Sequence, residues 1–186
     1  MIARLLRPRP LLALCAVLVL AAALLLSFGR PAICTCGAVR LWGEVGPAQS
    51  QMLADWYSPS HIVHGFLFYG LCHLAVPRWP VERRFAVAVA VEAAWELFEN
   101  TPLIIDRYRE ATIALGYSGD SVLNSLSDIV MMAIGFWGAR RFPIWVSAVV
   151  GLLLELIPLM AIRDNLTLNV WMLVAPSDAI RAWQAS

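Results

Sequence analysis

The sequence predicts an all-α integral membrane protein, a bundle of about five transmembrane helices with a polar cluster in the outer half of the membrane. Of its 186 residues, 60% are hydrophobic and only 15% are charged, and the mean hydropathy is +0.70. A soluble domain has roughly 45–50% apolar and about 25% charged residues. Apolar runs close to the length that a helix needs to cross a bilayer account for the excess.

The five helices are expected at about residues 11–28, 59–76, 85–105, 121–139 and 143–162 of a single membrane domain. The first run is longer than the apolar region of a signal peptide, and no clear A-x-A cleavage site follows it. We therefore expect a retained helix rather than a cleaved signal. PRWPVERR separates the second helix from the third, and Arg140 and Arg141 end the fourth.

Arginines predict the orientation of the bundle. Three precede the first helix, three lie in residues 77–84 and two end the fourth helix, all on one side if every helix crosses once. The positive-inside rule places that side in the cytoplasm of a bacterial inner membrane. Residues 29–57 and 106–119 are then external loops, and the C-terminus is periplasmic. The tail 163–186 is expected to be external and partly interfacial, because its apolar stretch is too short to span.

Composition also limits the partners. A net charge of +1 gives no reason to expect nucleic acid, whereas the apolar runs require a lipid bilayer. Cys34 and Cys36, in ICTCG, are either loop thiols or a local disulfide, and no further ligands at zinc-site spacing lie nearby. The sequence leaves the oligomeric state open.

Acidic residues mark one face of the third helix. Glu92, Glu96, Glu99 and Asn100 follow i, i+4, i+7 and i+8 spacing, which aligns them on one stripe. A charged side chain at the centre of a bilayer costs roughly 2.5–3.5 kcal/mol on insertion scales. This stripe is therefore expected to face the protein interior rather than lipid.

Two other helices carry polar groups at a similar depth. Asp120, Asn124 and Asp128 recur every four residues at the start of the fourth helix, where Asp120 could also act as a cap. His61 and His64 lie in the outer turns of the second helix. Groups from three helices thus converge in the outer half of the membrane, which predicts a buried site open to the periplasm.

Imidazole and carboxylate groups bind zinc, manganese and related ions, and they also act as general acids and bases. Arg107 and Arg109 at the mouth are candidates for binding an anionic head group. A divalent metal ion is a possible cofactor, with His64, Glu96 and Asp128 as its candidate ligands. The candidate catalytic residues are His61, His64, Glu92, Glu96, Asp120, Asn124 and Asp128.

Three hypotheses follow from this cluster. The first is metal-dependent or acid–base chemistry on a lipid or envelope intermediate. The second is a small transporter or proton-conducting component, which carboxylates near the mid-plane favour and the lack of an evident internal repeat disfavours. The third is a structural or assembly protein, in which the polar groups only hold the helices together.

Five motifs carry a resemblance to a known family. The segments ICTCG, DWYSPSHIVHGFLFYG, WELFENTPLIIDRYR, GDSVLNSLSD and IRDNLTLN, in this order, resemble an uncharacterised family of bacterial multi-pass inner-membrane proteins. That resemblance implies the membrane class and the location but adds no reaction. More distantly, the spaced histidines, glutamates and Asp120-x-x-x-Asn124 are similar to VanZ-like membrane proteins, a family associated with glycopeptide resistance.

Overall fold

The computed structural model describes residues 8–46, 48–112 and 116–186, and the elements in this part of the chain are helices joined by loops and turns. Five of the helices are long and three are short. The long helices are α1 (Pro8–Ser27), α2 (Ser58–Ala75), α3 (Val81–Glu99), α5 (Val122–Arg141) and α6 (Ile144–Ile162). The short ones are α4 (Pro102–Ala111), α7 (Leu166–Val174) and α8 (Asp178–Ala185), with a 3-10 turn, η2, at Gln49–Gln51.

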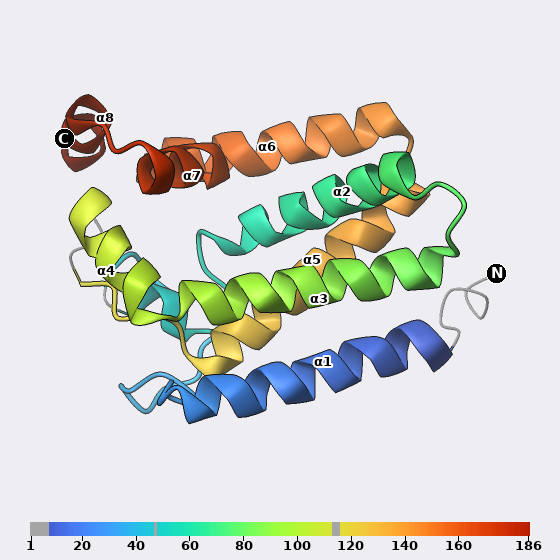
Figure 1. Cartoon of the computed structure of the whole chain (residues 1–186). Helices are drawn as coiled ribbons and strands as arrows, with labels where there is room; N and C mark the ends of the chain where they lie inside the picture. The colour runs from blue at the N-terminus through green and yellow to red at the C-terminus, as the bar shows by residue number, and fades with distance from the viewer. Residues whose placement is uncertain (1–7, 47, 113–115) are drawn as a thin grey trace.

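The axes of the long helices are roughly aligned with one another, with α1 on one side of the bundle and α6 on the other (Figure 1). The short α2–α3 and α5–α6 connections lie at the end where α1 begins. The long connection after α1, together with α4 and α8, lies at the opposite end (Figure 1). This arrangement is the one expected if each long helix crosses a membrane once.

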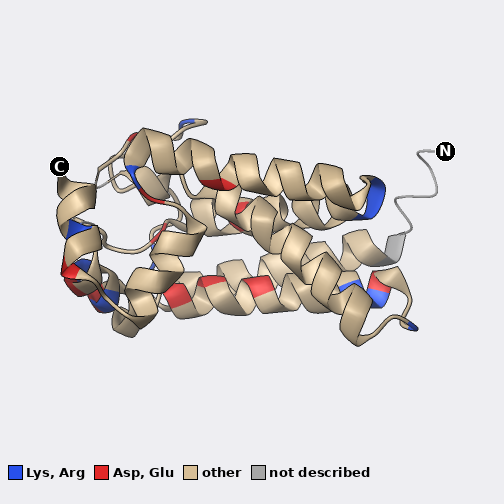
Figure 2. Cartoon of the chain, turned by 90° about the horizontal axis from the view of Figure 1, so that it is seen from above, with Lys and Arg blue, Asp and Glu red and all other residues tan. Residues whose placement is uncertain are grey.

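Three helices of the described chain are long and apolar enough to cross a membrane: α1, α5 and α6, with mean hydropathies of 2.7, 1.4 and 2.2 over their candidate spans. The helices α2 and α3 fall short, although each has at least 18 residues. Their composition explains this, because α2 contains three histidines and α3 contains Glu92, Glu96 and Glu99. Figure 2 shows acidic residues along the long helices and basic residues gathered at the two ends of the bundle.

The helices α1, α2, α5 and α6 begin and end within three residues of the ranges expected from the sequence. The helix expected at 85–105 differs. It begins at Val81 and ends at Glu99, and the apolar residues that follow belong to α4. The reason is Pro102, which lacks an N–H and disfavours helical backbone at Thr101, so a new helix begins there. The loop expected at 106–119 is accordingly helical up to Ala111.

The bundle has an apolar core between α1, α3 and α5, and α2 packs closely against α5. Ala21, Phe85, Val89, Ile129 and Phe136 are among the buried residues that join α1, α3 and α5. The helices α2 and α5 approach so closely that a Cβ at Gly65 would overlap the carbonyl oxygen of Met132. A Cβ at Gly135 would overlap that of Ile62. Glycines therefore allow backbone contact between the two helices that carry His61 and Asp128.

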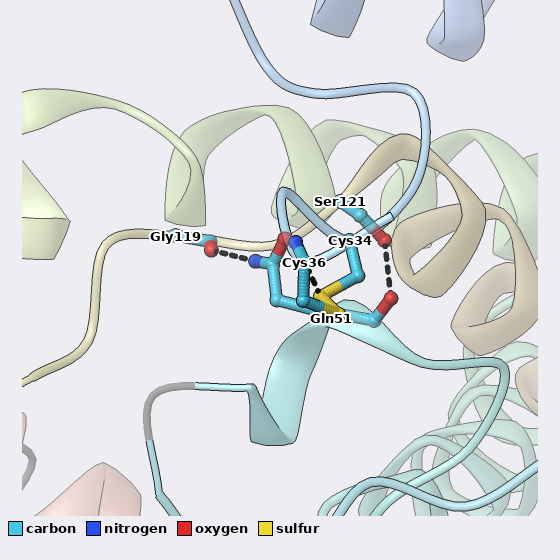
Figure 3. Close-up of a disulfide and its surroundings, with 5 residues drawn as sticks. All are labelled: Cys34, Cys36, Gln51, Gly119 and Ser121. Carbon is cyan, nitrogen blue, oxygen red and sulfur yellow. Dashed lines mark hydrogen bonds between the residues drawn. A yellow bond between two sulfur atoms is a disulfide. The ribbon is translucent and has the colours of Figure 1, made fainter. Parts of the chain in front are cut away.

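The loop 29–57 covers the start of α5. Cys34 and Cys36 form a disulfide, which is one of the two states left open by the sequence. Beside it, the side chain of Gln51 donates to the carbonyl oxygen of Gly119 at 2.6 Å, and Ser121 Oγ donates to the carbonyl of Gln51 at 3.1 Å (Figure 3). Ser121 also caps α5 by accepting from Asn124 N, so the cap is Ser121 rather than Asp120.

Candidate functional site

Glu92 is the centre of a histidine pair. Its carboxylate is completely buried, and its Oε1 lies 2.7 Å from His61 Nδ1. His64 Nδ1 lies 3.1 Å from both carboxylate oxygens. An ionised carboxylate only accepts hydrogen bonds, so Nδ1 of each ring carries the proton and Nε2 of a neutral ring offers a lone pair.

The other nitrogen of His61 faces α5. His61 Nε2 lies 3.7 Å from Asp128 Oδ2, a distance too long for a hydrogen bond but close to the separation of two ligands around one ion. Asp128 is held in turn by Ser58, whose hydroxyl donates to Oδ1 at 3.2 Å. A histidine held by a buried carboxylate and facing further carboxylates is the usual arrangement of a metal-binding histidine.

Glu96 contributes a buried carboxylate oxygen that has no hydrogen-bond partner among the described residues. The residue is 1% exposed, and its Oε1 makes no hydrogen bond within the described part of the chain. Its nearest partner is His61 Nδ1 at 3.5 Å, an atom already bonded to Glu92. An unbonded buried carboxylate oxygen costs free energy, so a bound ion or water that contacts this atom would stabilise the site.

Possible ligand atoms within 4.8 Å of one another define three groups among the described residues. They are His61, His64 and Glu92; His61, Glu96 and Asp128; and Glu96, Glu99 and Asp120. The set inferred from the sequence placed His64 with Glu96 and Asp128. In the structure, His61 shares a group with Glu96 and Asp128, whereas His64, about one turn further along α2, is grouped with His61 and Glu92.

These side chains line a cavity of about 310 Å³ between α2, α3, α4, α5 and α7. The polar wall includes His61, Glu92, Glu96, Glu99 and Asp128, and Trp95, Phe68 and Val91 add apolar surface. The cavity is large enough to hold an ion together with part of a ligand. The stripe spacing on α3 thus predicted the wall that this helix contributes.

Asp120 and Asn124 also lie in the cavity wall but have partners in the chain. Asp120 accepts from Asn100 Nδ2 at 2.8 Å and from the hydroxyl of Tyr117 at 3.0 Å. Asn124 Nδ2 donates to the carbonyl of Met52 at 3.0 Å. Both residues therefore fix the covering loops to α3 and α5, which makes them weaker candidates for chemistry than Glu96.

Two residues that line the cavity, Asp55 and Tyr57, were not identified as site residues from the sequence. Burial raises the pKa of Asp55 to about 6, although Tyr57 N and Ser58 N both donate to its Oδ1. Burial raises the pKa of Tyr57 well above its usual value, so its hydroxyl stays protonated and donates to Asp164 Oδ2 at 2.7 Å. The adjacency of Tyr57 to the SPSH segment was the only available signal.

The IRDNLTLN segment builds the start of α7 over the cavity. Asn165 caps the helix by accepting from Leu168 N at 2.8 Å, and the Glu155 carboxylate accepts from the backbone N–H groups of Leu166 and Thr167. Asn169, one turn on, accepts from the hydroxyl of Tyr108. The tail is thereby fixed to α4 and α6 and completes the cavity wall.

Arg107 and Arg109 each donate to a backbone carbonyl of another segment. Arg107 Nε donates to the carbonyl of Leu173 at 2.9 Å, and Arg109 Nε donates to that of Tyr117 at 2.6 Å. Neither residue lines the cavity. Their contacts connect α4 with α7 and with residue 117, and binding of a head group by either arginine stays a prediction.

Comparisons with known proteins show the family to which the chain belongs. The family model described as "Protein of unknown function (DUF2585)" matches residues 25–186. The chain belongs to the DUF2585 family. A UPF0314 protein of Sphingopyxis alaskensis is 55% identical over 172 residues, covering 91% of this chain and 92% of the relative. UPF0314 protein RL4541 of Rhizobium johnstonii is 53% identical over 171 residues, covering 91% and 88%. No solved structure shows a significant match.

Membership of DUF2585 confirms the resemblance to an uncharacterised bacterial family. A third relative, UPF0314 protein Atu8092 of Agrobacterium fabrum, is 54% identical over 169 residues, covering 90% of this chain and 85% of the relative. The matched range of the DUF2585 model contains every candidate site residue. The three apolar helices are consistent with a multi-pass membrane protein.

Proposed function

We propose that this DUF2585 protein is a multi-pass protein of the bacterial inner membrane that binds a divalent metal ion in its buried site. His61 Nε2, Asp128 and Glu96 would be the protein ligands. Glu92 would orient His61 from the outer shell. The observation that carries the proposal is the buried, unbonded Glu96 Oε1 beside a histidine whose Nδ1 is already held by a carboxylate.

Three protein ligands leave coordination positions open in the cavity. This is the pattern of a catalytic rather than a structural metal site, since structural zinc sites are closed by four protein ligands. A bound ion would lower the pKa of a coordinated water and polarise a substrate oxygen. His64, which the same Glu92 carboxylate orients, is placed to exchange a proton with a group in the cavity. The chemistry is therefore proposed to act on a lipid or envelope intermediate reached from the periplasmic side.

The direct test measures bound metal. The protein, purified in detergent without chelator, is expected to contain about one divalent ion per chain by elemental analysis. His61→Ala and Asp128→Asn should each lose most of it, while Asp106→Asn, which removes a carboxylate with a 65% exposed side chain, should retain it. A parent protein that binds no ion at micromolar affinity would contradict the proposal.

Two other functions predict different results. A transporter or proton-conducting component would give ion or proton flux in liposomes that Glu96→Gln abolishes. A structural role predicts that Glu96→Gln changes only the unfolding temperature, with metal content at zero in the parent as well. The VanZ-like similarity stays a prediction, and resistance to glycopeptides in cells producing the protein is its test.

A further inference from the structure

A second hollow adjoins the polar cavity. It is a groove of about 660 Å³ between α2 and α7, lined mainly by apolar side chains. The groove-lining residues Leu67 on α2 and Val170, Trp171 and Val174 on α7 are 46–77% exposed. This groove is open to the outside of the bundle, whereas the side chains of the polar cavity are largely buried.

The groove and the polar cavity share part of their walls. His64, Leu166 and Val170 line both. His64 forms the junction, because its Nδ1 bonds to Glu92 in the cavity while its ring stacks on Phe68, with the ring centroids 5.7 Å apart. The two spaces are therefore neighbours, and His64, Leu166 and Val170 form the wall between an apolar surface groove and a carboxylate-lined interior.

The depth of the groove indicates its surroundings. Leu67 lies nine residues after the start of α2, which is roughly 13 Å along the helix axis. In the bundle orientation inferred above, this depth lies within the hydrocarbon layer. An apolar groove at this depth faces lipid chains, and the polar cavity beside it offers histidines, carboxylates and the proposed metal ion to the polar part of a lipid.

We propose that the groove between α2 and α7 binds an acyl chain of the lipid substrate, whose polar end reaches the cavity past His64. The proposal rests on the proposed function, because it gives that site a substrate class, an acyl-chain-bearing membrane lipid. It also assigns a position to each part of the molecule. The chain lies along Leu67, Val170 and Val174, and the polar linkage lies beside His64 and the Glu96–Asp128 pair.

Photo-crosslinking tests the proposal. The full-length protein is placed in nanodiscs of phosphatidylethanolamine and phosphatidylglycerol that contain phosphatidylglycerol with a diazirine on one acyl chain. Cross-linked residues are then located by mass spectrometry. We expect saturable labelling at Leu67, and Val170→Trp, which fills the groove, should reduce that labelling about tenfold. Labelling of Leu152 on α6, which is 59% exposed and lies outside the groove, should stay unchanged.

The outcomes separate the two proposals. If Leu67 is labelled no more saturably than Leu152, or if Val170→Trp leaves its labelling unchanged, the groove proposal is wrong even when the metal content is normal. If the purified parent protein contains no metal but Leu67 is still labelled saturably, the proposed metal function is wrong and the groove proposal stands. Val174→Trp is the second variant if Val170→Trp does not fold, since Val174 is 77% exposed and lines the groove away from the cavity.

Discussion

Glu92→Gln is the substitution that isolates the outer-shell role proposed for Glu92. In the parent, Glu92 accepts from His61 at 2.7 Å and from His64 at 3.1 Å. A glutamine keeps the size of the side chain and one acceptor oxygen, which can still bond to His61. It removes the negative charge that makes the His61 ring a stronger ligand. Loss of such a partner lowers metal affinity about 10–100-fold, which is about 1.4–2.7 kcal/mol.

The assay is a chelator competition with zinc or manganese on purified protein in detergent, compared with Asp106→Asn as the exposed control. The variant is expected to fold, because glutamine keeps the size of the side chain and one acceptor for His61, and its unfolding temperature is measured as a check. Its dissociation constant should rise by one to two orders of magnitude. An unchanged dissociation constant in a folded Glu92→Gln protein would refute the role of Glu92 in orienting a metal-binding His61.

Three further predictions concern stability, pH and redox state. Gly65→Ala should lower the free energy of unfolding by about 1–3 kcal/mol, because its Cβ overlaps Met132 O, whereas Gly70→Ala, with no atom within 4 Å, should be neutral or stabilising; equal unfolding temperatures would contradict this. Asp55 has a pKa raised from 3.8 to about 6, so it favours folding below pH 4 and loses about 3 kcal/mol of that contribution as the pH rises through 6. Compared with the parent, Asp55→Asn should therefore raise the unfolding temperature more at pH 7 than at pH 4. An equal difference between variant and parent at the two pH values would contradict this. Maleimide should modify two thiols of the denatured, unreduced protein, Cys15 and Cys72, and four after reduction; four before reduction would exclude the Cys34–Cys36 disulfide.

Hydrophobic runs and i, i+4 spacing were sufficient to predict much of the bundle. They located the long helices and aligned Glu92 and Glu96 on the face of α3 that meets His61. The break between α3 and α4 was missed, because the apolar residues after Pro102 continue the run and hide the loss of its N–H. A hydropathy pattern records how apolar a segment is and carries no record of backbone hydrogen bonds.

The partners within the site depend on packing that no local pattern encodes. Depth along the helices placed His61 and His64 near Asp128. Only the rotation of α2 against α5, fixed at the Gly65 and Gly135 contacts, decides which histidine faces it. The contact of Tyr57 with Asp164 joins residues 107 positions apart, and no local spacing pattern predicts a contact over that separation.

Anomalous diffraction from crystals of the zinc- or manganese-loaded protein tests the metal site most directly. A site of the proposed kind gives an anomalous peak about 2 Å from His61 Nε2 and within bonding distance of the Asp128 and Glu96 carboxylates. It also leaves the His61 Nδ1 to Glu92 hydrogen bond in place. Crystals without a peak in this cavity, or with a peak bonded elsewhere, would show that the buried histidines and carboxylates serve a different purpose.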